Sequence, residues 1–232
     1  MEKLLSLILL NKPSMLFTEF VKFLPKIEKE KLLSRDAHIK MAPLERISYM
    51  DEENYLDKNP KIAAVLMLFY PKNEMVHLAL IVRNTYPGVH SSQIGFPGGK
   101  VELSDANLAE TALRETHEEV GVHPDKVKII KTFSEIYIPP SNFLVAPFMG
   151  IAHEELLFIP DETEVKKVLE FSLTDFLDKK SITKVNMSTS YAIDIEVPAF
   201  VVDKYIVWGA TAMMMSELKE VLNNVLPKFP VK

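Results

Sequence analysis

The chain has 232 residues, of which 47% are hydrophobic, and its formal net charge is −5. This length and composition indicate an ordinary globular protein with one domain and an added segment. The negative charge argues against non-specific binding to nucleic acid, which requires a basic surface.

The sequence contains no cysteine, which excludes disulfide bonds and thiol catalysis. A cysteine-free chain is compatible with a reducing cytoplasm, and this is the compartment that we expect.

The beginning of the chain is predicted to be a helical extension over residues 1–45. An apolar run at residues 4–10 is too short to span a membrane and precedes no small-residue cleavage site, so we expect no membrane anchor. After an interruption at Pro13, four apolar residues follow at helical spacing: Phe17, Phe20, Val21 and Leu24. We expect these helices to cover one face of the main domain, residues 46–232, or to support a homodimer.

Two strands are predicted next, at residues 63–69 and 77–83, joined by a hairpin-like turn at residues 71–74. Both are nearly continuous apolar runs, which is typical of strands that are buried on both faces. We therefore expect them at the centre of a sheet.

Glycines are concentrated in one region of the chain. Five of the seven glycines lie between residues 88 and 121, so unusual backbone geometry is required there. They surround a turn and a helix whose N-terminus Ser104 or Asp105 can cap and which Gly121 can end. We expect the chemistry of the protein in this region.

The predicted helix combines an apolar arc with a cluster of carboxylates. The arc consists of Leu108, Ala109, Ala112, Leu113, Thr116 and Val120. Glu115, Glu118 and Glu119 share a face that borders the arc, so they should lie at the rim of a packed interface. Clustered like charges destabilise a helix, and Arg114 is the only arginine or lysine within it.

The three glutamates therefore need another source of positive charge. Mg²⁺ and Mn²⁺ prefer carboxylate and carbonyl oxygens, and a glycine turn can expose a carbonyl. Zinc fits poorly because the chain has no cysteine and its histidines lack ligand spacing. Without the glycine turn, such glutamates are more often a solvated helix face.

The turn and the helix together resemble the Nudix box of the Nudix hydrolases, whose pattern is G-x5-E-x7-R-E-U-x-E-E-x-G-U with U aliphatic. The matching residues are Gly99, Arg114, Glu115, Glu118, Glu119 and Gly121. The early acid is Asp105, one residue further from the arginine than in the pattern, and Thr116 occupies an aliphatic position. The partner of Arg114 is thus open among Asp105, Glu102 and Glu110.

This resemblance implies the Nudix fold, an α/β (α+β) architecture with a mixed β-sheet in an α/β/α sandwich. It also implies that the three box glutamates, with a carbonyl of Gly98 or Gly99, hold one or more Mg²⁺ or Mn²⁺ ions. The expected catalytic residues are Arg114, which braces the glutamates, and Glu115, Glu118 and Glu119. Metal ions that bridge diphosphate oxygens neutralise charge and orient water for in-line attack.

The segment before the box resembles the Nudix subfamily that hydrolyses coenzyme A. In that subfamily a strand-end arginine is followed by a histidine, a glutamine and Phe-Pro-Gly-Gly, and here the corresponding residues are Arg83, His90, Gln93 and Phe96 to Gly99. The second arginine of the subfamily is missing, and Ser92 replaces a glycine. The resemblance implies that substrate is bound by Arg83, His90, Gln93 and Phe96. For His90, a structural hydrogen bond within a loop is an equal alternative.

After the helix, strands are predicted at residues 127–130 and 133–138, and residues 139–148 lead into another strand. An acidic loop and helix at residues 161–177 again resemble the subfamily. In Nudix enzymes an acid outside the box can assist as base or metal ligand, so Glu162 and Glu164 are candidates. The alternative is that both belong to the acidic first turn of a helix.

The C-terminal part is predicted to form a hairpin within residues 185–208 and a last helix from Met213 to Val225. The stretch from Trp208 to Ala212 that opens this helix also resembles the coenzyme A subfamily. Three consecutive methionines in the helix are explained by burial on one side.

The resemblance implies a metal-dependent pyrophosphohydrolase whose partner is a small nucleotide. The preferred substrate is coenzyme A or acyl-coenzyme A, which would give adenosine 3',5'-bisphosphate and 4'-phosphopantetheine or its acyl form. One alternative is another nucleoside diphosphate derivative, such as ADP-ribose or a dinucleotide, or a nucleoside triphosphate. Another is a non-catalytic, nucleotide-binding regulator on the same scaffold.

Overall fold

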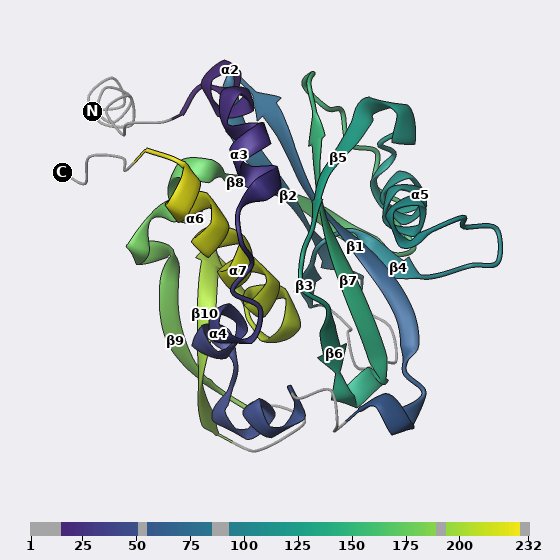
Figure 1. Ribbon diagram of the computed structural model, residues 1–232, viewed down its shortest axis with the longest axis vertical. Coiled ribbons are helices and arrows are strands. Elements are labelled where there is room, and N and C mark those ends of the chain that lie inside the picture. Colours follow the sequence, from purple (N-terminus) through teal and green to yellow (C-terminus); the bar gives the residue numbers. More distant parts are fainter. Residues whose placement is uncertain (1–14, 51–54, 85–92, 189–193, 228–232) are drawn as a thin grey trace.

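The computed structural model describes residues 15–50, 55–84, 93–188 and 194–227 (Figure 1). These residues form a mixed sheet of eight strands and a smaller antiparallel sheet of three. The strands are β1 Lys61–Lys72, β2 Met75–Arg83, β3 Ile94–Gly95, β4 Gly98–Lys100, β5 Val127–Thr132, β6 Ile136–Ile138, β7 Phe143–Ala152, β8 Val165–Ser172, β9 Ile182–Met187, β10 Ile195–Val202 and β11 Tyr205–Val207.

The helices are α2 Phe17–Phe20, α3 Leu24–Lys29, α4 Arg35–His38, α5 Leu108–Val120, α6 Leu173–Leu177 and α7 Gly209–Val225. Short 3-10 helices connect them: η1 Val21–Phe23, η2 Ile39–Met41, η3 Leu44–Tyr49, η5 Leu56–Lys58, η6 Pro124–Lys126, η7 Pro139–Ser141 and η8 Lys179–Ser181. None of the helices formed by the described residues has the length and apolarity that a membrane span requires.

β1 is the central strand of the large sheet. It pairs in parallel with β7 and antiparallel with β2 and β4. Its side chains alternate between two hydrophobic cores: Ala63, Val65, Met67 and Phe69 enter one, and Ala64, Leu66, Leu68 and Tyr70 enter the other. The continuous apolar run is therefore explained by burial on both faces, as the sequence predicts.

The two cores lie on opposite faces of the sheet, with helices on each side (Figure 1). On one side α5 buries Ala112 and Val120 against Leu66 and Leu68. On the other, α7 packs together with α2, α3 and the small sheet. The predicted sandwich of a mixed sheet between helices is confirmed.

The N-terminal segment shares the larger core with α7. Phe17, Phe20, Leu24 and Ile27 are buried in that core. Residues 1–14 lie outside the described residues, and the division at residue 45 and the homodimer stay predictions.

The hairpin between β1 and β2 turns through Asn73 and Glu74, which have φ of 48° and 65°. Both residues are in the left-handed region that a tight two-residue hairpin turn requires. The predicted hairpin is thus confirmed, with longer strands than expected.

The predicted helix within residues 161–177 is largely wrong. Residues 165–172 form strand β8, which pairs antiparallel with β2, and only the five residues of α6 are helical. Val165, Leu169 and Phe171 are buried in this strand. Pairing with β8 covers the edge of β2, whose backbone groups would otherwise be exposed. Long-range strand pairing therefore decides the structure of this segment.

The C-terminal predictions are closer to the structure. The expected hairpin is formed by β10 and β11, and β9 extends it to three strands. α7 begins at Gly209, four residues before the predicted start, with Trp208 as its N-cap. The additional first turn of α7 lines the cavity that is described below.

Candidate functional site

The glycine turn requires its glycines. Gly98, in β4, has φ of 148°, and a Cβ atom there would collide with the backbone of Ala64 and Val65. A Cβ atom on Gly99 would collide with the carboxylate of Glu115. The absence of both side chains lets the turn lie directly against β1 and against the glutamates of α5.

α5 carries the three glutamates, and both of its ends are capped. Its N-cap is Asn107, whose side chain accepts a hydrogen bond from the Glu110 N–H at 3.0 Å. The prediction of Ser104 or Asp105 as the cap is therefore wrong. At the other end, Gly121 is left-handed with φ of 75°, which confirms the predicted stop.

Asp105 instead binds Arg114, which identifies the arginine's partner among the three candidates. The guanidinium donates Nε to Oδ1 at 2.9 Å and Nη2 to Oδ2 at 3.0 Å. Thr111 Oγ1 and the N–H of Glu102 donate to Oδ2 at 2.8 and 2.9 Å. The hydrogen bonds from Arg114 hold the pKa of Asp105 well below its usual range.

Arg114 also binds two of the three box glutamates. Nη1 donates to Glu115 Oε1 at 3.0 Å and to Glu118 Oε2 at 2.9 Å, and Nη2 donates to the Lys100 carbonyl at 3.0 Å. All five N–H groups of a guanidinium are thus engaged. Arg114 fixes the glycine turn and α5 relative to each other, because its acceptors belong to both.

Asp105→Asn should therefore destabilise the protein by about 3 kcal/mol at neutral pH, since an amide N–H₂ would face the Arg114 donor in a pair that is mostly buried. The measurement is denaturant unfolding, with the exposed Asp125→Asn as the control. Because the folded-state pKa of Asp105 is lowered, its stabilisation is present above its ordinary value of 3.8 and is lost as pH falls below that value. The difference between wild type and variant should shrink in the same range. Equal stability at pH 7 would contradict this assignment.

The three glutamates differ in exposure. The exposed fractions of their side chains are 56% for Glu118, 16% for Glu115 and 2% for Glu119. Burial raises the pKa of Glu119 to about 7, although Arg83 and the Gly98 N–H lower it, and burial also raises the pKa of Glu115. The prediction that all three glutamates lie at the rim of the interface is therefore wrong for Glu119, which is buried.

Glu119 is held between the glycine turn and Arg83. Its Oε2 accepts a hydrogen bond from the Gly98 N–H at 2.8 Å. Its Oε1 lies 3.1 Å from Arg83 Nη1, but it is buried and accepts no hydrogen bond. Arg83 Nη2 also donates to the Gly98 carbonyl at 2.8 Å. The predicted substrate-binding Arg83 therefore contacts two of the predicted metal ligands.

Within the described ranges, no three carboxylate or histidine side chains are already gathered as a metal cluster. Arg114 and Arg83 bind the box carboxylates instead. The donor set nevertheless fits a hard divalent cation, because it consists of carboxylate and carbonyl oxygens. The buried Oε1 of Glu119 has no hydrogen bond, and the turn at Gly99 leaves room for the Glu115 carboxylate.

The two candidate acids outside the box, Glu162 and Glu164, lie in the loop that precedes β8. The N–H of Ile159 donates to the Val120 carbonyl at 2.9 Å, and the N–H of Asp161 donates to the Glu119 carbonyl at 3.0 Å. These hydrogen bonds attach the acidic loop to the end of α5 that carries the glutamates. The charge of Glu164 contributes to the raised pKa of both Glu115 and Glu119. The interpretation of these acids as the first turn of a helix is wrong, since strand β8 follows.

A cavity of about 470 Å³ opens beside the glycine turn. Its size is in the range of small-molecule sites. Three of the residues that we expect to bind substrate, Arg83, Gln93 and Phe96, line it together with Gly98 and Gly99. His90 lies outside the described residues.

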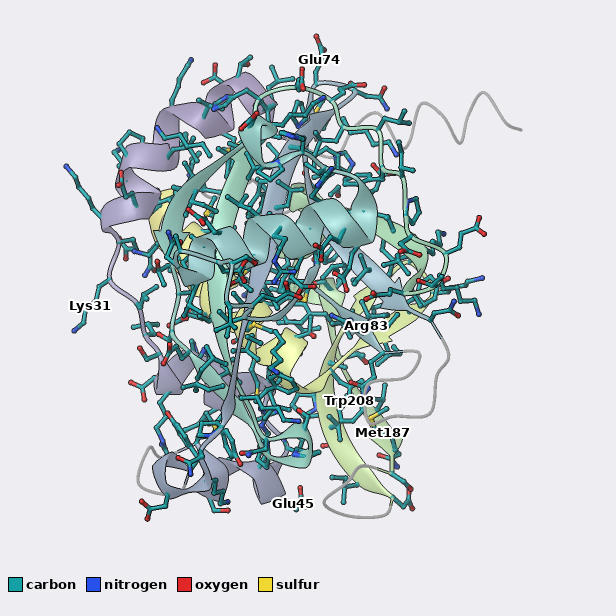
Figure 2. The ribbon with its side chains drawn as sticks, turned by 90° about the vertical axis from the view of Figure 1, so that its right-hand side faces the viewer. Lys31, Glu45, Glu74, Arg83, Met187 and Trp208 are labelled. Carbon is teal, nitrogen blue, oxygen red and sulfur yellow. The ribbon has the colours of Figure 1, made fainter. Side chains whose placement is uncertain are left out.

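The cavity is also lined by segments that lie far from the Nudix box in the sequence. These lining residues include Arg46 of η3, Phe143 of β7, and Trp208, Thr211 and Met214 at the start of α7. Figure 2 labels Arg83 and Trp208, which line this one cavity from β2 and from the N-terminus of α7. The similarity of residues 208–212 to the coenzyme A subfamily indicated that this stretch belongs to the site. Nothing in the sequence indicated that Arg46 does.

Comparisons with known proteins show the family of this chain. The family model described as the NUDIX domain matches residues 59–189, more than half of the chain. The chain is 34% identical over 171 residues to a protein of Enterobacter sp. (strain 638) described as "Uncharacterized Nudix hydrolase NudL", covering 69% of this chain and 82% of that protein. It is 31% identical over 176 residues to "Nudix hydrolase 15, mitochondrial" of Arabidopsis thaliana, covering 73% of this chain and 61% of that protein.

A solved structure shares the fold. The Nudix hydrolase RenU of M. smegmatis superposes with a TM-score of 0.50 at 15% identity, over 73% of this chain and 89% of that one. The family match, the curated relatives and the glycine turn beside the glutamates of α5 all lead to one conclusion: the chain belongs to the Nudix family and is a Nudix hydrolase.

Proposed function

We propose that this Nudix hydrolase cleaves the diphosphate of coenzyme A or acyl-coenzyme A to adenosine 3',5'-bisphosphate and 4'-phosphopantetheine or its acyl form. The observation that carries the proposal is the cavity, whose lining contains the predicted metal ligands Gly98 and Gly99 together with Arg83, Gln93 and Phe96. These last residues belong to the segment that resembles the coenzyme A subfamily. A diphosphate at the turn would thus leave the rest of the nucleotide inside the cavity.

Nudix hydrolases generally use divalent metal ions, and we assign Mg²⁺ or Mn²⁺ to this site. Glu115, Glu118 and Glu119, with a carbonyl of Gly98 or Gly99, would hold the metal. A bound metal would neutralise diphosphate oxygens and lower the pKa of a water molecule. Arg114 keeps Glu115 and Glu118 in place through the hydrogen bonds described above.

For the general base we favour Glu164 over Glu162. The charge of Glu164 contributes to the raised pKa of both Glu115 and Glu119. In the proposed reaction Glu164 takes a proton from the attacking water as the new oxygen–phosphorus bond forms. The bond from that phosphorus to the bridging oxygen breaks, and the second phosphate leaves.

The remaining wall of the cavity favours a large substrate over inorganic diphosphate. Its apolar side chains, among them Ile138, Phe143, Val145 and Trp208, suit the non-phosphate parts of a nucleotide. Arg46 and Lys100 add positive charge. We further propose that the enzyme works in the cytoplasm, in agreement with the absence of cysteine.

The test is mass spectrometry of the products formed from coenzyme A with Mg²⁺ or Mn²⁺ in ¹⁸O-labelled water. We expect the two phosphate products, with the label in only one of them, which identifies the attacked phosphorus. Intact coenzyme A, with turnover of ADP-ribose or a dinucleotide, would overturn the substrate assignment and favour the alternative. The missing second arginine and Ser92 are the observations behind that alternative. Tight binding without any product would support the regulator.

A further inference from the structure

Arg83 contacts the oxygens that a metal ion would need. Its Nη1 lies 3.1 Å from Glu119 Oε1, and its Nη2 donates to the Gly98 carbonyl at 2.8 Å. We infer that Arg83 and the divalent metal ion compete for these two oxygens, and that the displaced guanidinium then binds the diphosphate of the substrate. This inference rests on the proposed function, because it takes Glu119 and the Gly98 carbonyl as metal ligands.

The two cations exclude each other for an electrostatic reason. A guanidinium within hydrogen-bond distance of the Gly98 carbonyl would be only a few ångströms from a metal ion on the same oxygen, and like charges at that separation repel strongly in a partly buried site. Only 2% of the Glu119 side chain is exposed, so solvent screens this repulsion little. Metal binding must therefore move the guanidinium.

The two contacts of the Arg83 guanidinium differ in strength: the contact with the Gly98 carbonyl is a 2.8 Å hydrogen bond, and the contact with Glu119 is weaker. The contact with Glu119 Oε1 is an ion pair without a hydrogen bond, so it lacks the directed geometry that makes such pairs strong. Glu119 itself is fixed by the Gly98 N–H at 2.8 Å. When the pair separates, the carboxylate stays and the arginine leaves.

The cavity offers the displaced guanidinium a new binding position. Arg83 lines the cavity beside Gly95, Gly98 and Gly99, and 23% of its side chain is exposed. A planar guanidinium binds phosphate oxygens through two parallel hydrogen bonds, which suits a diphosphate at this wall. Arg83 thus exchanges the negative charge of Glu119 for that of the substrate.

The exchange couples the two binding events. The metal ion releases Arg83 for the diphosphate, and the diphosphate offers the released arginine a new partner, so each should raise the affinity for the other by the same factor. The protein would then bind metal weakly until the diphosphate arrives. Arg83 is a substrate-binding residue in this scheme, and it also couples the binding of metal to the binding of substrate.

The test compares Mn²⁺ binding to the full chain and its variants by isothermal titration calorimetry at pH 8. It is made without nucleotide and with a non-hydrolysable methylene analogue of ADP. For Arg83→Gln without nucleotide, we expect Mn²⁺ to bind about tenfold tighter than to wild type, because the competing cation is gone. The analogue should tighten Mn²⁺ binding by a larger factor in wild type than in Arg83→Gln, because only wild type gains the coupling through the arginine.

Lys184→Gln is the control, since it removes one positive charge at an exposed residue outside the cavity lining, where the lysine pairs with Glu196. It should bind Mn²⁺ as wild type does. Arg83→Lys keeps the charge and serves if the glutamine variant does not fold; it should bind Mn²⁺ alone no tighter than wild type and lose part of the coupling. Mn²⁺ affinity in Arg83→Gln equal to or weaker than that of wild type would overturn the competition. Absence of Mn²⁺ binding to every variant would overturn the proposed metal site itself, which separates the two failures.

Discussion

Glu119→Gln should lower the turnover of the diphosphate substrate by at least about a hundredfold, with little change in folding. The amide cannot supply the negative charge that holds a divalent cation at the glycine turn. The fold should persist because burial raises the pKa of Glu119 to about 7, so its surroundings accept a neutral side chain. The amide oxygen can also accept the hydrogen bond from the Gly98 N–H.

The measurements for this variant are kcat, Mn²⁺ affinity and thermal unfolding followed by circular dichroism. The matched control is Glu110→Gln on the same helix, since Glu110 only accepts a hydrogen bond from the Ala106 N–H, which glutamine can also accept. It should behave as wild type. Turnover of Glu119→Gln near the wild-type value would refute the assignment of Glu119 as a metal ligand.

Adding one methyl group at each of the two adjacent glycines should give two different results. Gly98→Ala should lower the free energy of unfolding by roughly 3 kcal/mol or more. Its φ of 148° is unfavourable for alanine, and the new Cβ would collide with the backbone of Ala64 and Val65, which cannot move without distorting β1.

Gly99→Ala should affect the site more than the fold. Its Cβ would meet the carboxylate of Glu115, a side-chain end that can rotate away only by breaking its 3.0 Å hydrogen bond with Arg114. We expect Mn²⁺ affinity and turnover to fall about tenfold or more, with a stability loss below about 1.5 kcal/mol. Denaturant unfolding and Mn²⁺ titration of both variants would check the pair; equal stability losses would show that the two glycines have the same role.

The chemistry-bearing helix was predictable because its signals are local. The apolar arc, the glutamate spacing and Gly121 all lie within about four turns of one helix, and the structure has the helix where the pattern places it. The buried strand pair at residues 63–69 and 77–83 was predictable for the same reason. The N-cap was not predictable, since Ser104, Asp105 and Asn107 are all good N-cap residues, and Asp105 binds Arg114 of the same helix instead of capping it.

The sequence by itself determined the family pattern, the central strands and the helix that carries Arg114 and the box glutamates, because short-range periodicity encodes these. Tertiary structure alone decided which acid binds Arg114, the depth at which Glu119 is buried, and the pairing of β8 with β2 in place of a helix. It also brought Arg46 and Trp208, 162 positions apart, to one cavity with Arg83. Contacts between distant segments depend on how strands pair and cores close, and the polarity pattern of a single segment does not specify its partner.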